Sequence, residues 1–323
     1  MRVGIVGCGL IGRKRVEAVL SCGLEVSMVV DVDFSRAEAL ASMAGARAGT
    51  DWREVTDSNV DIVIVAVTPE WLPVISLAAL EAGKHLLVEK PGARSAAEIA
   101  PVAAAARLHG RIAKVGFNHR FHPAVLKAKE IIDIGGVGTL MFLRGRYGHG
   151  GRPGYEREWR CQPEISGGGE LLDQGSHLID LSRWFLGDLT LMYAATPTFF
   201  WDTTVDDNCF LVLQAKDGQL AWLHASWSEW KNMFSFEIYG RTGKLAIEGL
   251  GGSYGVERLT HYAMLPEMGP PETTTWEYPR PDSSWITEVR HFVAAIREGQ
   301  DSISNLDDTH AVLTIIDQAY ERS

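Results

Sequence analysis

The sequence predicts an α/β protein of two domains. Strand and helix patterns alternate over the first third of the chain, as in a parallel sheet covered by helices on both faces. A G-x-G-x-x-G segment follows the first predicted strand and precedes the first predicted helix, which is typical of a doubly wound sheet. After about residue 190, short β-rich runs separated by glycines indicate an antiparallel sheet. Because 323 residues are enough for two cores, we place the domains at residues 1–120 and 121–323.

Hydrophobic periodicity predicts the elements of the first domain. The run at 62–67 is continuously apolar, as expected of a parallel strand buried on both faces. The helix at 72–82 ends at Gly83, a C-cap signal. The full set has strands at 2–6, 25–30, 62–67, 85–88 and 112–116, and helices at 13–20, 35–44, 72–82 and 95–108.

The second half of the chain is predicted to be richer in strands. A helix at 123–132 and a strand at 139–146 lead into a loop of glycines and arginines and then another helix. Strands are expected at 209–214, 219–228, 234–239 and 244–248, with Gly218, Gly240 and Gly243 between them. Two helices, at 284–298 and 307–320, close the chain.

Composition excludes several classes of protein. The formal net charge of −10 disfavours nucleic acid as a partner, because a phosphate backbone requires a basic surface. No apolar run is long enough to span a bilayer, and no secretory signal is recognisable, so we expect a cytoplasmic protein without a membrane partner. Four scattered cysteines are expected to stay reduced. His119 and His122 lack supporting ligands, so no metal site is predicted.

The glycine-rich segment has the context of a dinucleotide-binding turn. Gly7 permits the tight turn, Gly9 lets a pyrophosphate approach the backbone, and Gly12 lets helix and strand pack closely. Asp31 lies at the end of the second strand, about 20 residues on, where a ribose ligand is expected. The alternative is a plain glycine turn with Asp31 as a helix cap, and position and context together disfavour it.

Asp31 also predicts which cofactor is bound. A carboxylate there accepts hydrogen bonds from the ribose 2′-OH of NAD and repels the 2′-phosphate of NADP. The next residue is Val32 rather than arginine, and Arg36 fits the following helix better. The sequence therefore favours NAD, with NADP less favoured.

Lys90 stands where a strand ends, just before Pro91. Ligands of doubly wound sheets bind outside the carboxyl ends of the strands, so Lys90 is expected at the edge where the nicotinamide lies. A solvated surface lysine is the alternative and the usual fate of this residue type. Pro91 weakens that alternative because it restricts the backbone of the residue before it.

The segment GGGELLDQGSHLIDL, residues 167–181, carries a second candidate group. Asp173 and His177 are four residues apart on a predicted helix and share a face, which suits general acid–base catalysis. A structural pair on a buried helix is the alternative, and the segment alone does not decide between the two. Asp180 is interpreted as structural, with Leu181 and Trp184 packing below it.

These segments together resemble the glucose–fructose oxidoreductase/inositol dehydrogenase family, written Gfo/Idh/MocA. The similar segments are GIVGCGLIG, VTP at 67–69, EKP at 89–91, GFNHRFHP at 116–123 and GGGELLDQGSHLID, and they cover nearly the whole chain. The resemblance implies a Rossmann domain for NAD, then an α/β domain with a large, open, mainly antiparallel sheet for substrate binding and oligomerisation. It also implies that Lys90, Asp173 and His177 form the catalytic group.

The turn and the resemblance together predict the site residues. Cofactor contacts are expected at Gly7, Gly9, Leu10, Ile11, Gly12, Asp31, Thr68, Pro69, Glu89 and Lys90. Substrate contacts implied by the resemblance are Lys90, Asn118, Arg120, Asp173 and His177. The family often has a histidine a few residues after TP, whereas Pro73 stands here with Trp71 near it. We therefore transfer no particular substrate, although the chain looks most like members that act on sugars or sugar nucleotides.

The implied function is that of an NAD-dependent dehydrogenase acting on a secondary alcohol of a sugar, sugar nucleotide or polyol. His177 would exchange the hydroxyl proton, Lys90 would hydrogen-bond the same oxygen, and Asp173 would orient both. One alternative is an NAD-dependent glycosidase with transient oxidation, which would accumulate no NADH. Another is a sugar-sensing regulator without chemistry, which the presence of Lys90, Asp173 and His177 disfavours.

An arginine-rich loop predicts the charge of the substrate. Residues 144–160 contain five arginines against two glutamates, and the loop leads towards the helix of Asp173. Arg152 and Arg160 are therefore predicted to bind an anionic group such as a diphosphate or a carboxylate. Pairing of these arginines with nearby acids is the alternative.

The strand at 219–228 predicts an oligomer. Leu220, Trp222 and His224 share one face, and Leu223, Ala225 and Trp227 share the other. Because both faces carry apolar groups and the domain's own helices cover one, we expect a second subunit on the other, in a homodimer or homotetramer.

Overall fold

The computed structural model describes residues 1–322, which form two compact units. The first unit consists of residues 1–118, 164–167 and 285–313, and the second of residues 119–163, 168–284 and 314 onwards. The first break thus lies two residues before the boundary predicted at 120. Unlike the contiguous division expected from the sequence, the chain returns to the first unit after residue 284.

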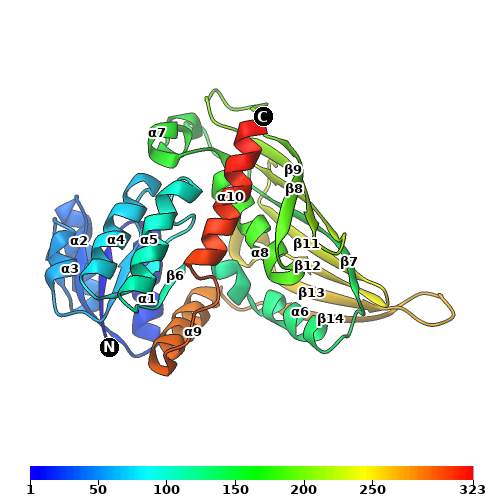
Figure 1. Cartoon of the computed structure of the whole chain (residues 1–323), viewed down its shortest axis with the longest axis horizontal. Coiled ribbons are helices and arrows are strands. Elements are labelled where there is room, and N and C mark those ends of the chain that lie inside the picture. Colours follow the sequence, from blue (N-terminus) through cyan, green and yellow to red (C-terminus); the bar gives the residue numbers. More distant parts are fainter. Residues whose placement is uncertain (323) are drawn as a thin grey trace. The chain divides into compact units, whose positions relative to one another are not determined.

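A six-stranded parallel sheet forms the first unit, in the order β3-β2-β1-β4-β5-β6. Its strands are β1 Arg2–Val6, β2 Glu25–Val30, β3 Arg47–Gly49, β4 Ile62–Val65, β5 His85–Val88 and β6 Ala113–Val115. Its helices are α1 Leu10–Ser21, α2 Phe34–Ala44, α3 Arg53–Asp57, α4 Leu72–Glu81, α5 Ala96–Leu108 and α9 Ser284–Glu298, labelled in Figure 1. All four residues of β4 are buried, because helices cover both faces of a parallel sheet.

An eight-stranded sheet forms the second unit, in the order β14-β13-β12-β11-β7-β10-β9-β8. Only β7 and β10 pair in parallel, so the sheet is mainly antiparallel. The strands are β7 Leu140–Gly148, β8 Leu189–Ala195, β9 Asn208–Ala215, β10 Leu220–Ser226, β11 Met233–Gly240, β12 Gly243–Glu248, β13 Glu257–Ala263 and β14 Glu272–Tyr278. The predicted fold class is confirmed.

Helices cover one face of this large sheet. Helix α6, Pro123–Asp133, packs on β12, β13 and β14, and α8, Ser176–Leu186, packs on β7 and β10 (Figure 1). Alternate residues of β10 are buried, whereas Leu220 and Trp222 on the opposite face are each 42% exposed. Helix α10, Leu306–Arg322, is divided between the two units at residue 313.

Several elements differ from the sequence prediction. The strand predicted at 62–67 ends at Val65, because the chain turns there towards the 3-10 helix Pro69–Trp71. Strands β3, β8, β13 and β14 were not predicted. Strand β3 has three residues, and the other three are partly exposed, with β13 and β14 also rich in polar residues, so their sequences alone do not indicate strands. None of the helices among residues 1–322 combines the length and the apolar character needed to cross a bilayer.

Candidate active site

The glycine-rich turn of the first unit leaves space where a dinucleotide would approach. Gly7 has φ +96°, and a Cβ there would lie 2.2 Å from the Ala66 carbonyl oxygen. A Cβ on Gly12 would lie 1.9 Å from the Gly7 oxygen, so helix α1 packs directly on the turn. A Cβ on Gly9 would meet nothing within 4 Å. Gly9 is also the N-cap of α1 and has no side-chain cap, so the first N–H groups of the helix are available to a phosphate.

Asp31 is held against this turn. Its carboxylate accepts hydrogen bonds from the N–H of Cys8 at 2.7 Å and from the N–H of Asp33 at 3.0 Å. The pKa of the Cys8 thiol rises to about 12, mainly through burial and also through the charge of Asp31. Arg36 pairs with Asp33 at 3.3 Å, as expected for a residue of helix α2. The residues present therefore fit an adenosine ribose and a pyrophosphate.

The other predicted cofactor residues lie at ends of strands or of helix α1 in the same unit. Leu10, at the first position of α1, is 74% exposed. Ile11 follows it and is half-buried. Thr68 precedes the turn that begins at Pro69, and its hydroxyl donates to Glu70 at 2.9 Å. Trp71 closes that turn with a side chain that is 48% exposed.

Glu89 and Lys90 follow β5 directly. Lys90 is half-buried, and its peptide bond to Pro91 is cis. The Glu89 carboxylate is 6% exposed and points into an ion-pair cluster, where its Oε1 lies 2.5 Å from Nη2 of Arg15. Burial raises the pKa of Glu89, and Arg15 opposes that effect. The Glu89 side chain is therefore engaged within the first unit, and its cofactor contact stays a prediction.

The helix that carries Asp173 and His177 begins at a clamp formed by Asp206 and Tyr320. The Asp206 carboxylate accepts from the N–H groups of Gly169 at 3.0 Å and Leu171 at 2.7 Å, and from the Tyr320 hydroxyl at 2.8 Å. A Cβ on Gly169 would lie 2.0 Å from the Asp206 carbonyl oxygen, and one on Gly168 would lie 2.3 Å from the Tyr320 hydroxyl. Two of the three consecutive glycines are therefore required by this close approach.

Asp173 lies in a π-helical turn, Leu171–Gly175, that continues directly into α8. His177 is 4% exposed, and its ring stacks on His119 with centroids 3.8 Å apart. The ring of Tyr147, from β7, lies 6.1 Å from that of His177. Burial raises the pKa of Tyr147 well above its usual range, and the neighbouring Tyr254 and Asp173 add to this. The second unit thus assembles a carboxylate, imidazoles and a neutral phenol.

Arg160 contacts Asp173, as its predicted place near this helix requires. The Arg160 Nε lies 3.3 Å from an Asp173 oxygen, and its Nη1 lies 3.4 Å from Glu158. Although burial alone would lower the pKa of Arg160, Asp173 and other neighbouring groups raise it. Arg160 thus places a positive charge beside the Asp173 carboxylate.

Arg120 has a structural partner. Its Nε and Nη2 contact the two carboxylate oxygens of Asp180 at 2.8 and 2.6 Å, and both side chains are almost fully buried. This bidentate pair agrees with the structural role expected for Asp180. Asn118, the last residue of the first unit, is buried at 5% exposure.

The arginines of the 144–160 segment mostly have acidic partners. Arg152 lies 2.5 Å from Glu158, Arg157 lies 3.8 Å from Glu156, and Arg144 lies 2.8 Å from Glu237. The pairing alternative therefore accounts for most of the loop's excess positive charge.

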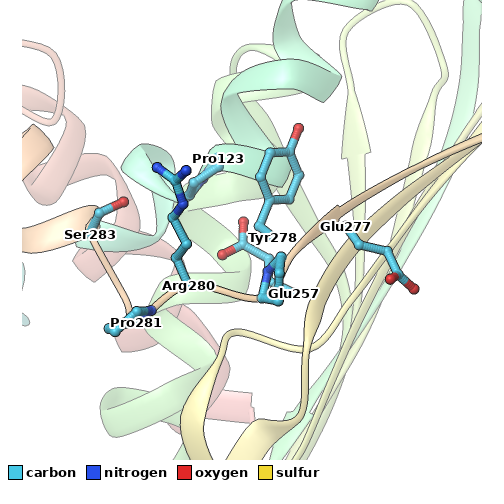
Figure 2. A pocket seen from close by; sticks show the side chains of 8 residues that line it. Pro123, Glu257, Glu277, Tyr278, Arg280, Pro281 and Ser283 are labelled. Atoms are coloured by element: carbon cyan, nitrogen blue, oxygen red, sulfur yellow. The ribbon is translucent and has the colours of Figure 1, made fainter.

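A cavity of about 510 Å³ in the second unit lies apart from these groups. Figure 2 shows Tyr278, the last residue of β14, and Arg280, just after it, at this cavity, while Glu277 points away. Glu257 is already bound, because it accepts from the Ala124 N–H at 2.6 Å and contacts His122 Nδ1 at 3.0 Å. None of the predicted site residues lines this cavity. Among residues 1–322 no group of three or more potential ligands is arranged to hold a metal ion.

Sequence reasoning missed four side chains that shape these sites. His119 was considered only as a metal ligand, and Tyr147, Asp206 and Tyr320 were not considered. The glycines before the helix were a usable signal, since close backbone approach requires a partner. Nothing in the sequence indicated that the partner is Asp206.

The fold and these groups define an NAD-binding oxidoreductase domain joined to a second α/β domain. Residues 1–117 match the oxidoreductase family with an NAD-binding Rossmann fold, and residues 125–246 match the Gfo/Idh/MocA C-terminal domain. The chain therefore belongs to the Gfo/Idh/MocA family, as its motifs predicted.

Curated relatives and solved structures agree with this assignment. Inositol 2-dehydrogenase 2 of Saccharopolyspora erythraea is 33% identical over 68% of this chain and 65% of its own length, just under two thirds. Levoglucosan dehydrogenase of Pseudarthrobacter phenanthrenivorans is 28% identical over 76% of this chain and 73% of its own. A structure of levoglucosan dehydrogenase with NADH and levoglucosan superposes with TM-score 0.90 at 24% identity, covering 100% of this chain and 98% of that one, which shows the fold.

Proposed function

We propose that this protein is an NAD-dependent dehydrogenase that oxidises a secondary hydroxyl group of a sugar or cyclic polyol. The observation that carries the proposal is the clamped helix, which presents Asp173 and the buried His177 beside Tyr147. Relatives named inositol 2-dehydrogenase, levoglucosan dehydrogenase and D-glucoside 3-dehydrogenase support this substrate class.

In the proposed reaction the chain's own residues handle the proton. His177 accepts it from the substrate hydroxyl, and Asp173, paired with Arg160, stabilises the resulting imidazolium. Lys90 hydrogen-bonds the same oxygen as negative charge develops on it. NAD, when bound, supplies the hydride acceptor.

The proposal is tested by the NADH that accumulates. Purified protein is screened with NAD against inositols, anhydrosugars, glucosides and uronates, with His177→Asn as the inactive control. One NADH per molecule of ketone product supports a dehydrogenase. Release of an aglycone without NADH would support the glycosidase alternative, and binding without any turnover would support a sensor.

The preference for NAD rests on Asp31. Asp31→Ala removes the acceptor for the ribose 2′-OH and the repulsion of a 2′-phosphate, so the NAD Kd rises by roughly 10- to 30-fold while the NADP Kd falls or stays level. Asp33→Ala is the matched control, because that carboxylate caps helix α2. A wild-type protein that binds NADP more tightly would contradict the assignment.

An anionic substituent on the substrate stays a prediction. Arg152 pairs with Glu158, and Arg160 pairs with Glu158 and Asp173, so both guanidinium groups already have carboxylate partners. A uronate with a kcat/KM at least tenfold above that of its neutral parent, lost in Arg152→Ala, would support it. Equal efficiency at low salt would leave the arginines as partners of the acids.

The exposed face of the large sheet supports an oligomer. Leu220 and Trp222 of β10, and Met192 and Tyr193 of β8, are 42–56% exposed, and only β9 separates the two strands. We propose a homodimer or homotetramer through this face, in which Trp222→Glu yields monomers and Leu108→Glu, at an exposed residue of the first unit, does not. A wild-type monomer in light scattering would contradict this proposal.

We also propose a cytoplasmic location, which the four free cysteines support.

A further inference from the structure

Four charged side chains lie together inside the first unit. Arg15 of α1, Lys114 of β6 and Glu288 of α9 are fully buried, and Glu89, just after β5, is 6% exposed. The tetrad carries two positive and two negative charges, so it is neutral as a set. Buried charges are costly unless they are paired, which makes the pattern of pairing informative.

The tetrad consists of two ion pairs, Arg15–Glu89 and Lys114–Glu288, which a contact between Arg15 and Glu288 connects. Glu89 Oε1 accepts a hydrogen bond from Nε of Arg15 at 2.6 Å and lies 2.5 Å from Nη2 of the same guanidinium group. Glu288 is paired with Lys114 at 3.0 Å and also with Nη1 of Arg15 at 2.5 Å. Removal of one member therefore leaves an uncompensated charge, whereas removal of a whole pair does not.

The cluster leaves no free space around Glu89. A Cβ on Gly116 would lie 2.6 Å from Nη2 of Arg15 and 3.0 Å from the Glu89 carboxylate. The ring of Trp285 covers the other side of Arg15, with the guanidinium carbon 4.5 Å from its centroid. Backbone bonds also fix Glu89, since its N–H donates to Val65 and its carbonyl accepts from Gly92. Glu89 is thus held at both its backbone and its side chain.

Arg15 connects this residue to the cofactor turn. Helix α1 begins beside Gly9, and Arg15 lies on its buried face one and a half turns later. Glu89 immediately precedes Lys90, and Lys90 contributes to the electrostatic environment of the Glu89 carboxylate. Arg15 therefore links helix α1, whose N-terminus would bind the pyrophosphate, to Glu89, the residue before Lys90.

We propose that Arg15 is a positioning residue for Lys90, and that it acts by holding the Glu89 carboxylate. This inference rests on the proposed function only for the claim that correct placement of Lys90 matters to turnover. The placement itself is a property of the first unit and is measurable without any reaction.

The test compares two charge-balanced double variants. Arg15→Met/Glu89→Gln removes the pair next to Lys90 and leaves Lys114 bonded to Glu288. Lys114→Met/Glu288→Gln removes the other pair, together with the charge that Glu288 presents to Arg15, and leaves Arg15 bonded to Glu89. Arg15→Lys is the third variant, because it keeps all four charges and loses the double contact with Glu89.

The first measurement is the acetylation rate of Lys90 by a trace amount of an amine-reactive ester, followed by peptide mass spectrometry. The exposed Lys216 is the internal reference. We expect the rate at Lys90 to change at least fivefold in Arg15→Met/Glu89→Gln, and to change in the same direction in Arg15→Lys. In Lys114→Met/Glu288→Gln it stays within twofold of wild type.

The second measurement is turnover. Because a displacement of about 1 Å at a reacting group can cost roughly 100-fold, kcat should fall by about that factor in Arg15→Met/Glu89→Gln. It should fall by about tenfold in Arg15→Lys, with the KM for the sugar nearly unchanged. The Lys114→Met/Glu288→Gln protein should keep kcat within about threefold.

The outcomes separate this inference from the proposed function. If the two double variants change Lys90 labelling equally, the tetrad only stabilises the fold and Arg15 has no specific role in positioning Lys90, which would overturn the inference. If Arg15→Met/Glu89→Gln does not fold, unchanged labelling in Arg15→Lys overturns it. Normal turnover in Lys90→Ala would instead overturn the catalytic role of Lys90, and the labelling would still decide how Lys90 is held.

Discussion

Lys90 in the first unit and the Asp173–His177 helix in the second unit are held by different kinds of contact. Glu89, beside Lys90, is fixed by side-chain ion pairs in a neutral buried tetrad. The helix of Asp173 is fixed at its start by one buried carboxylate, Asp206, whose partners are backbone N–H groups and the Tyr320 hydroxyl.

The two arrangements differ in whether a cation stabilises the ionised form of the buried carboxylate. Although burial alone would raise the pKa of Glu288, Arg15 and Lys114 lower it, so that carboxylate stays ionised. Asp206 has no cation among its hydrogen-bond partners, and burial raises its pKa to about 6 despite the N–H donors. We therefore expect the support of the helix to respond to mildly acidic pH, and the Glu288 end of the tetrad to be insensitive to it.

The largest expected effects belong to the reacting groups themselves. Lys90→Ala should lower kcat by about 10²- to 10³-fold, and His177→Asn by about 10²- to 10⁴-fold. Lys90→Ala keeps the Glu89 contacts that hold its segment, so its urea midpoint should stay close to wild type, whereas His177→Asn loses the ring stack on His119 and should lower the midpoint. NAD affinity, measured by protein fluorescence, should also be nearly unchanged. Near-normal turnover in Lys90→Ala would return Lys90 to the role of a surface charge.

The next effect is the dependence of stability on pH through Asp206. The folded-state pKa is about 6, against an ordinary value of 3.8, so the folded protein holds this proton more tightly than the unfolded chain. Stability from this group is complete below pH 4 and declines as pH rises to about 6, by up to about 3 kcal/mol in the free energy of unfolding. Above pH 6 its contribution is constant.

Asp206→Asn isolates this effect. Urea unfolding of both proteins is measured between pH 4 and 7, and the wild-type free energy minus that of the variant should fall across the interval. A difference that is flat, or that rises with pH, would show that the N–H donors dominate over burial and that Asp206 is fully ionised.

A smaller effect is expected from Tyr320→Phe, which removes one hydrogen bond to Asp206. Loss of a buried donor to a carboxylate should destabilise the protein by about 1–2 kcal/mol. The apparent Asp206 midpoint should move to higher pH, because the ionised form loses a partner. Tyr193→Phe is the control, since that ring is 56% exposed. Equal stability of Tyr320→Phe and Tyr193→Phe would remove Tyr320 from the clamp.

Much of the first unit followed from local sequence. Apolar periodicity predicted the strands β1, β2, β4 and β5. The glycine-rich turn predicted a strand before it and the helix α1 after it. The second unit was predicted less completely. Strands β13 and β14 are partly exposed and rich in polar residues, so their sequences alone do not indicate that they pair.

The candidate sites divide in the same way. Gly7, Gly9, Gly12 and Asp31 were identified because a cofactor turn needs those residue types within a short stretch of chain. The substrate contact of Arg120 stays a prediction, and the residue that holds its guanidinium group, Asp180, lies 60 positions away in the sequence. The sequence shows how many arginines the loop contains, but it does not show which acids they pair with, because that depends on the directions of the side chains.

The sequence by itself determined the class of fold, the dinucleotide turn, the family, and the identity of Lys90, Asp173 and His177 as candidates. The turn and the candidates depend on short motifs, and the fold class and the family depend on the order of such motifs along the chain. The tertiary structure alone decided what holds the candidates in place: Arg15 on Glu89, Asp206 and Tyr320 on the helix of Asp173, and Arg160 on Asp173 itself. Most of these partners are distant in sequence, so the packing of strands and helices decides which of them meet. Burial then requires the pairing, because an unpaired buried charge is costly.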